Sequence, residues 1–347
     1  MGHLTDFYLL SGLRAFAARP ADGEGTAGVR AALFRPLAGR WLIVALASLT
    51  LTLAATASSA VSGDVWGHIE WWGGIAIPAI ALSAEFLLMG WKVSSLRRLC
   101  VSPSVSARSD LLYQALVLMG GMEMLVRLSA CGLLAVVEGM SPGAVGWISL
   151  ADLPIWLRLP LLLLAGNFVG YWEHRAMHSR WLWPLHKAHH SAKEFTIVNA
   201  FRGHPLEFGL QAITSTAFLA LLGFSADDIA LYVVVGSYAA AFVHSNLTRL
   251  DWLQHLGVMT AGGHRMHHAV DPACHGRNFG DMLNIWDRLF GTYLATRPGV
   301  TEVEIGVEEQ AGRHNTGNPL AEIAFQTKDW LAVLLREATR RAASISQ

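Results

Sequence analysis

The sequence predicts an all-α fold: a multi-pass transmembrane helical bundle of four spans and a shorter helical hairpin, with a cytosolic cap rich in histidine. Of the 347 residues, 53% are hydrophobic and only 15% are charged, whereas a soluble domain carries about 25% charged residues. Several apolar runs approach the ~20 residues that a membrane-spanning helix needs. Twelve of the fifteen histidines lie between His174 and His275. The formal net charge of zero gives no general attraction to nucleic acid, so we expect no nucleic-acid partner.

Four apolar runs are long enough to cross a hydrocarbon core about 30 Å thick, at about 1.5 Å per helical residue. These runs are residues 41–62, 70–91, 111–137 and 154–172. Two shorter runs, 208–224 and 229–243, are separated by the polar residues 225–228 and predict a helical hairpin. Their lengths leave open whether the hairpin crosses the membrane fully or re-enters it.

The distribution of Lys and Arg predicts the orientation of the spans, because cytosolic loops carry an excess of these residues. Residues 1–40 carry five arginines and the 92–110 loop carries four basic residues, whereas 63–69 and 138–153 carry none. Both termini are therefore expected on the cytosolic side of an integral membrane protein, together with the polar segment 173–207 and the histidines at 264–268.

Charged residues well inside a predicted span are costly and often functional, and Glu85, Glu123 and Arg127 are of this kind. Glu123 and Arg127 are four residues apart and are expected to pair on one helix, with a role at a substrate headgroup or cavity left open. Glu85 lies six residues before the basic end of its span and is expected to reach the interface.

Eight histidines form three short groups that read HRAMH, HKAHH and HRMHH. They are His174, His178, His186, His189, His190, His264, His267 and His268. Spacings of three or four residues put imidazoles on one face of a helix. Neutral imidazole is the commonest metal ligand, and eight exceed the three or four of a single zinc site. The pattern indicates two metal ions, and it leaves iron, zinc and copper open.

The three groups resemble the HxxxH, HxxHH and HxxHH histidine boxes of the membrane fatty acid hydroxylase/sterol desaturase superfamily. Further stretches are similar to that family in the same order: RGHPLE at 202–207, HSN at 244–246, NFG at 278–280 and WDRLFGT at 286–292. The resemblance covers residues 154–292, and neither the first three spans nor the C-terminal tail is part of it.

The resemblance implies a di-iron centre that uses O2 as co-substrate, with the eight box histidines as ligands of two iron ions. His244 and His204 are further candidate ligands, and a structural role is the alternative for His204. Four residues are candidates to orient ligand imidazoles by accepting their second N–H. These are Asn246, Asn278, Asp281 and Asp287. Asp287 is equally suited to pair with Arg288 or Arg265.

The implied function is a membrane-bound, O2-dependent lipid hydroxylase, with a lipid desaturase of the same superfamily as the alternative. The substrate would be a lipid or sterol in the membrane, oxidised at an unactivated C–H bond. The sequence carries no nucleotide-binding GxGxxG after a strand, no haem CxxCH and no cysteine cluster for iron–sulfur. Electrons are therefore expected from a separate ferredoxin, cytochrome b5-like protein or reductase.

Two functions of other classes compete with this interpretation. A metal transporter would place histidines and carboxylates within the spans, whereas the box histidines follow them. A zinc hydrolase would need an acidic general base within a box, as in HExxH, and Glu173 beside His174 is the nearest match.

The predicted organisation has four parts: a cytosolic lead-in (1–40), N-terminal transmembrane helices (41–153), a fatty acid hydroxylase-like catalytic domain (154–292) and a cytosolic tail (293–347). The tail contains an amphipathic helix at 320–341. Gly262 and Gly263 precede the third box and are expected to break the chain ahead of a helix start.

Overall fold

The structure, a computed structural model, describes residues 65–101, 103–139, 149–296, 300, 303–307 and 313–345. All of them belong to one compact unit, Ala47–Gln347. The predicted lead-in (1–40) and first span (41–62) lie outside the described residues. The described residues form a helical fold, and the only extended backbone pairings among them are isolated bridges between Val258 and Leu283 and between Ala269 and Ile305. The all-α prediction is confirmed for this part of the chain.

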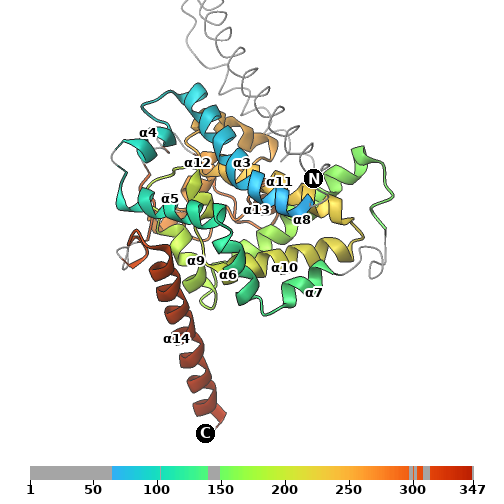
Figure 1. The fold of residues 1–347 in the computed structure, drawn as a ribbon, viewed down its shortest axis with the longest axis vertical. Helices are drawn as coiled ribbons and strands as arrows, with labels where there is room; N and C mark the ends of the chain where they lie inside the picture. The colour runs from blue at the N-terminus through green and yellow to red at the C-terminus, as the bar shows by residue number, and fades with distance from the viewer. Residues whose placement is uncertain are drawn as a thin grey trace, which may run out of the picture. The chain divides into compact units, whose positions relative to one another are not determined.

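The helices follow one another in the order shown by the colour ramp of Figure 1. The α-helices are α3 (Val65–Met89), α4 (Ser95–Cys100), α5 (Val105–Leu118), α6 (Gly121–Ser129), α7 (Leu133–Glu138), α8 (Ile155–Met177), α9 (Trp183–His190), α10 (Pro205–Leu221), α11 (Ala226–Val243), α12 (Ala261–His267), α13 (Ile285–Leu289) and α14 (Pro319–Ile345). The 3-10 helices are η1 (Val198–Phe201), η2 (Thr248–Leu256) and η3 (Pro272–Cys274).

Two described helices, α8 and α11, are long and apolar enough to cross a membrane. The fourth predicted span is thus a helix of 23 residues that continues past residue 172 into the first histidine box. The predicted hairpin is also confirmed as a pair of helices, α10 and α11. Ser225 begins α11 as an N-cap, with Asp228 completing a capping box. The apolar part of α3, Ile75–Met89, is shorter than a full span.

The third predicted span is not one helix. Residues 111–137 are divided among α5, α6 and α7, and α5 and α6 are bent by 78° at their junction. Gly120 and Gly132 adopt left-handed backbone conformations, with φ of +70° and +81°, and each separates two helices. Glycine adopts this conformation without the steric cost that a Cβ brings. The prediction of a continuous span was therefore wrong, and the bent pair counts as at most one broken span.

The helices around the histidine boxes are held by apolar contacts between segments far apart in sequence. Leu162 of α8 packs with Leu219 and Ala220 of α10 and with Ile229 of α11. The predicted C-terminal amphipathic helix is confirmed as α14, which packs against α9 and α5 at its start and then runs away from the other helices (Figure 1). The C-terminal tail therefore contacts the helix that carries the second box.

Candidate metal centre

Four helix ends bring the candidate ligands together. The first box ends α8, the second ends α9, the third lies on α12, and His244 follows the last residue of α11. Because α8 and α11 are the two span candidates, the site lies at one end of both. The candidate ligands of these four segments are buried, except that His178 is partly buried and His189 is 9% exposed. The chain thus gathers imidazoles in a place shielded from water.

The first histidine cluster takes residues from all three boxes. Its members are His174, His178, His186, His190 and His267, and one nitrogen of each lies within 4.8 Å of the others. The Nε2 atom of His267 is 3.1 Å from that of His178 and 3.2 Å from that of His190. The Nε2 atoms of His186 and His190 are 3.1 Å apart.

The second histidine cluster consists of His189, His244, His264 and His268. The Nε2 atom of His244 lies 3.2 Å from that of His189 and 3.1 Å from that of His264. His268 Nε2 is 3.1 Å from His264 Nε2. The rings of His190 in the first cluster and His268 in the second are stacked, with centroids 4.1 Å apart. The two clusters are therefore adjacent.

The orientation of the rings fits two metal ions. Several imidazoles place Nδ1 against a backbone carbonyl: His174 at 2.8 Å from Phe279 O, His244 at 2.8 Å from Ala240 O, and His267 at 2.6 Å from Arg277 O. When Nδ1–H donates in this way, Nε2 keeps its lone pair for a metal. Separations near 3.1 Å between Nε2 atoms are those of ligands about 2.0–2.1 Å from a shared ion.

One buried nitrogen without a hydrogen-bond partner gives a second test of whether the clusters fit metal ions. His174 Nε2 is buried and has no hydrogen-bond partner among the described residues. Its ring lies 4.5 Å from the ring of His267 and 5.0 Å from that of His186. A buried imidazole nitrogen without a hydrogen-bond partner is costly unless an ion binds it. The donor set, all nitrogen, suits iron, zinc or copper rather than magnesium or calcium.

Burial also sets the charge of the candidate ligands. Loss of water lowers the pKa of the box imidazoles outside the span well below the ordinary 6.5, and neighbouring imidazoles lower it further. This holds for His178, His186, His189, His190, His264, His267 and His268. Burial lowers the pKa of His244 to about 4. These side chains are neutral at pH 7, which is the form that binds metals.

Residues 159–292 match the family model described as fatty acid hydroxylase. The chain is 29% identical over 147 residues to alkylglycerol monooxygenase of Xenopus tropicalis, which covers 40% of this chain and 31% of that protein. It is 29% identical over 154 residues to ornithine lipid hydroxylase OlsE of Rhizobium tropici (44% and 46%). It is 27% identical over 157 residues to Delta(7)-sterol 5(6)-desaturase ERG3A of Gibberella zeae (44% and 42%). Each matched stretch covers less than half of the relative, and no solved structure gives a significant match.

The matched region contains all nine histidines of the two clusters. This part of the chain belongs to the fatty acid hydroxylase/sterol desaturase superfamily. The hydroxylase region begins within α8 and ends at Thr292, so it also contains the other residues that were predicted to serve the centre.

His204 lies outside both clusters of the hydroxylase region. Its side chain caps the start of α10, where Nδ1 accepts a hydrogen bond from the Leu206 N–H at 3.1 Å. Its Nε2 is 2.9 Å from the Thr327 hydroxyl of α14. Both ring nitrogens are therefore engaged in contacts of a structural kind. His244, by contrast, lies between His189 of the second box and His264 of the third.

Of the four predicted orienting residues, only Asp281 approaches a box imidazole, with Oδ1 3.4 Å from His174 Nδ1. Asn278 bridges the carbonyls of Gly263 and Leu294. Asp287 accepts hydrogen bonds from the backbone of residues 279 and 280 and from the Thr292 hydroxyl, and pairs with neither arginine. These contacts hold the segment 278–294, whose Phe279 carbonyl lies against His174 Nδ1.

Asn246 belongs to a buried network around Glu85. Its Nδ2 donates to Glu85 Oε1 at 3.0 Å, and its Oδ1 accepts from Arg265 Nη2 at 2.9 Å. Glu85 is fully buried and also accepts the Ser95 hydroxyl at 3.1 Å. The expectation that Glu85 reaches the interface was wrong, because α4 folds back and supplies donors that replace water. The expected pair of Glu123 and Arg127 is confirmed, on a partly exposed surface.

Glu207 was missed by the sequence reasoning, although it lies in a family-like stretch. Its Oε1 is 2.6 Å from His186 Nδ1, and both side chains are buried. The sequence feature that could have revealed Glu207 is its position three residues after the N-cap His204. At this position the first turn of α10 directs a side chain toward α9.

The glycines before the third box lie inside α12 rather than ahead of it, which corrects the predicted break. Thr260 is the N-cap of this helix, and its hydroxyl accepts from Gly263 N–H. A Cβ on Gly262 would lie 2.1 Å from Asp251 Oδ2. Gly262 is therefore required because η2 packs directly on the helix.

Proposed function

We propose that this chain is a membrane-bound, di-iron, O2-dependent lipid hydroxylase that inserts oxygen into an unactivated C–H bond. The observation that carries the proposal is the pair of adjacent histidine clusters, of five and four imidazoles, at the ends of α8 and α11. In this proposal the nine cluster histidines hold two iron ions, and His204 is not among the ligands. When bound, the iron ions supply the activation of O2 and the oxidation of the C–H bond.

A lipid substrate is supported by the surfaces of the two span candidates. Large apolar side chains are exposed along α8, where Trp156 is 74% exposed, and along α11, where Val233 is 45% exposed. Transfer of such apolar surface from water into hydrocarbon is favourable. A membrane lipid would therefore meet the clusters where the helices leave the bilayer. The matched relatives named for alkylglycerol and ornithine lipid oxidation support the same class of substrate.

The chain's own residues orient the ligands and keep water away from them. The carbonyls of residues 279, 240 and 277 accept the Nδ1 protons and fix the rings. Phe279 lies 5.2 Å from the ring of His178, and Phe195 lies 5.2 Å from the ring of His268. These apolar walls limit access of water, which favours oxidation of the substrate over side reactions.

The site is proposed to face the cytosol, as the distribution of Lys and Arg predicts. Electrons are proposed to come from a separate ferredoxin, cytochrome b5-like protein or reductase, since the hydroxylase chemistry consumes electrons that the histidines do not supply.

The experiment is to express the full chain, purify it in detergent, and measure iron per chain and O2 consumption with a chemical reductant. We expect about two irons per chain from the two clusters and a lipid product that has gained one oxygen atom relative to extracts lacking the protein. His267→Ala should abolish the product, whereas His255→Ala, at an exposed position outside the clusters, should retain it.

The outcomes separate the competing functions. A lipid product that has lost two hydrogen atoms and gained no oxygen would indicate the desaturase of the same superfamily. Zinc in place of iron, with no O2 consumption and unchanged lipids, would contradict any oxygenase and favour a hydrolase or a metal-handling protein.

A further inference from the structure

Arg202 is the largest fully buried side chain in the described part of the chain. It lies between α5, the residue that follows the second box, and the C-terminal tail. Its guanidinium pairs with Asp110 of α5 at 3.1 Å and with Glu322 of α14 at 3.4 Å. All three side chains have no exposed area. A buried charge of this kind is stable only when its partners remain in place.

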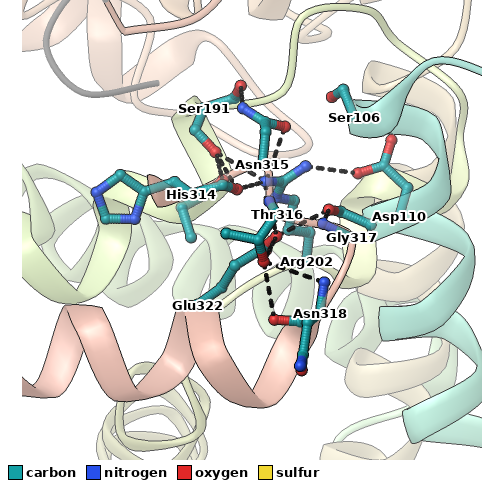
Figure 2. Close-up of polar contacts among 12 residues, drawn as sticks. Ser106, Asp110, Ser191, Arg202, His314, Asn315, Thr316, Gly317, Asn318 and Glu322 are labelled. Atoms are coloured by element: carbon teal, nitrogen blue, oxygen red, sulfur yellow. Dashed lines mark hydrogen bonds and ion pairs between the residues drawn. The ribbon is translucent and has the colours of Figure 1, made fainter. Parts of the chain in front are cut away.

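The residues before α14 complete the surroundings of Arg202 (Figure 2). Arg202 Nη2 donates to the backbone carbonyl of His314 and, at 3.0 Å, to Asn315 Oδ1. Glu322 Oε1 accepts the Thr316 N–H at 2.7 Å and the Ser109 hydroxyl at 2.8 Å. The C-terminal segment 314–322 is therefore tied to Arg202 through backbone and side chain alike. It lies beyond the hydroxylase region, which ends at residue 292.

Arg202 also reaches the second histidine cluster, but through its backbone. Its carbonyl oxygen is 3.1 Å from Nδ1 of His189, which is the contact that orients this ring toward the cluster. Its Nη2 donates to the Ser191 hydroxyl at 2.9 Å, and Asn315 Nδ2 donates to the Ser191 carbonyl at 2.7 Å. Ser191 follows directly on the second box. The anchored side chain thus holds a carbonyl against a candidate ligand and the end of α9.

We propose that Arg202 is a positioning residue for the second histidine cluster, held in place by the C-terminal segment 314–322 through Glu322. The C-terminal segment 314–322 is then a structural part of the metal-binding unit. This inference rests on the proposed function only in that the clusters bind metal. The contact of Arg202 with His189 is direct, and its contact with the first cluster runs only through Ser191. A change at Arg202 should therefore weaken the second cluster more than the first.

The test is a Co(II) titration of the metal-depleted full chain in detergent, read by the visible absorption of bound Co(II). Two double variants isolate the clusters. In the first background, H178A with H267A, only the second histidine cluster is intact, and in the second background, H244A with H264A, only the first cluster is intact. Loss of an outer-shell partner typically costs 10- to 100-fold in metal affinity. We expect Arg202→Lys to weaken Co(II) binding about 10- to 100-fold in the first background and far less in the second.

Glu322→Gln is a milder variant, because it removes one buried charge and keeps the side-chain shape. It should also lower the Co(II) affinity of the second cluster, and it replaces Arg202→Lys in the test if that variant fails to fold. The matched control is Arg158→Lys, which disturbs another ion pair, with Asp228 at 3.1 Å. Arg158 lies 16 residues before His174 on α8, about 24 Å along the helix. It should leave Co(II) affinity unchanged in both backgrounds.

Unchanged affinity in both backgrounds for Arg202→Lys and Glu322→Gln would overturn the inference while leaving the proposed function intact. Equal losses in the two backgrounds would also overturn it, because they would indicate general destabilisation of the fold. If the unsubstituted chain binds no Co(II) and no Fe(II), the proposed function fails and the inference fails with it.

Discussion

Replacing Glu207 by Gln should weaken the first histidine cluster and spare the second. The Glu207 Oε1 atom lies 2.6 Å from Nδ1 of His186, and the side chains are 3% and 4% exposed, so water screens the contact little. Above about pH 8, where the Glu207 carboxyl is ionised, a hydrogen bond to a charged group contributes about 1.5–3 kcal/mol, and one between neutral groups about 0.5–1.5 kcal/mol. The amide should therefore cost about 1–1.5 kcal/mol, which is about tenfold in metal affinity.

The assay is an anaerobic titration of the metal-depleted chain with Fe(II) or Co(II), with the two sites resolved by substituting the histidines of the other cluster. Glu173→Gln is the matched control, since this carboxylate accepts the Ser215 hydroxyl at 3.0 Å and forms no hydrogen bond with an imidazole of the described residues. Unchanged affinity at the first cluster, or equal losses at both, would refute the reasoning.

A second measurement separates loss of metal binding from loss of folding. Burial raises the pKa of Glu207 to about 8 in the metal-free chain. Between the ordinary pKa of 4.5 and about 8, the folded state holds a proton that the unfolded state has released. Stability therefore falls as the pH rises through this range, and the loss is complete above about 8. The metal-free Glu207→Gln variant should unfold at the same or a higher temperature than the unsubstituted chain above this pH.

Three other predictions concern the centre and its supporting helices. Burial lowers the pKa of box imidazoles such as His189 and His268 well below 6.5. The metal-free fold should therefore lose stability in thermal unfolding as the pH falls below about 6.5. Constant stability across this pH range would contradict the prediction. His204→Ala should keep both metals in a metal analysis but lower stability by about 1 kcal/mol, the usual worth of an N-cap; loss of a metal would show that it is a ligand. Gly166→Ala should destabilise the fold by about 1–3 kcal/mol in thermal melts, because the added Cβ would lie 2.2 Å from Tyr232 Cε2; a melt equal to that of the unsubstituted chain would contradict this packing.

Local periodicity accounts for the parts of the centre that the sequence predicted. Spacings of three and four residues place imidazoles on one helix face, and the boxes do lie at the ends of α8 and α9 and on α12. The apolar run of α8 is long enough to be recognised without any tertiary contact. The predicted continuous span at 111–137 failed because two glycines with positive φ end helices that the hydropathy pattern alone would continue.

The assignment of ligands to the two clusters followed from tertiary packing. His189 and His190 are neighbours in sequence, yet they belong to different clusters. Successive helix residues point about 100° apart, since a turn takes 3.6 residues, and only the surrounding helices decide which cluster each ring meets. His264 and His267 are divided between the clusters in the same way. The box pattern alone carries no information on this division.

The sequence by itself determined that the chain is helical and apolar, that eight histidines form three boxes, and that they suit two metals. Only the tertiary structure decided that His244 joins the second cluster, that His204 caps a helix, and that Glu207 contacts His186. It also decided that Arg202 is bound by the C-terminal tail, 120 residues further along the chain. The physical reason is that helix periodicity is local, whereas hydrogen bonds and burial depend on which distant segments pack together.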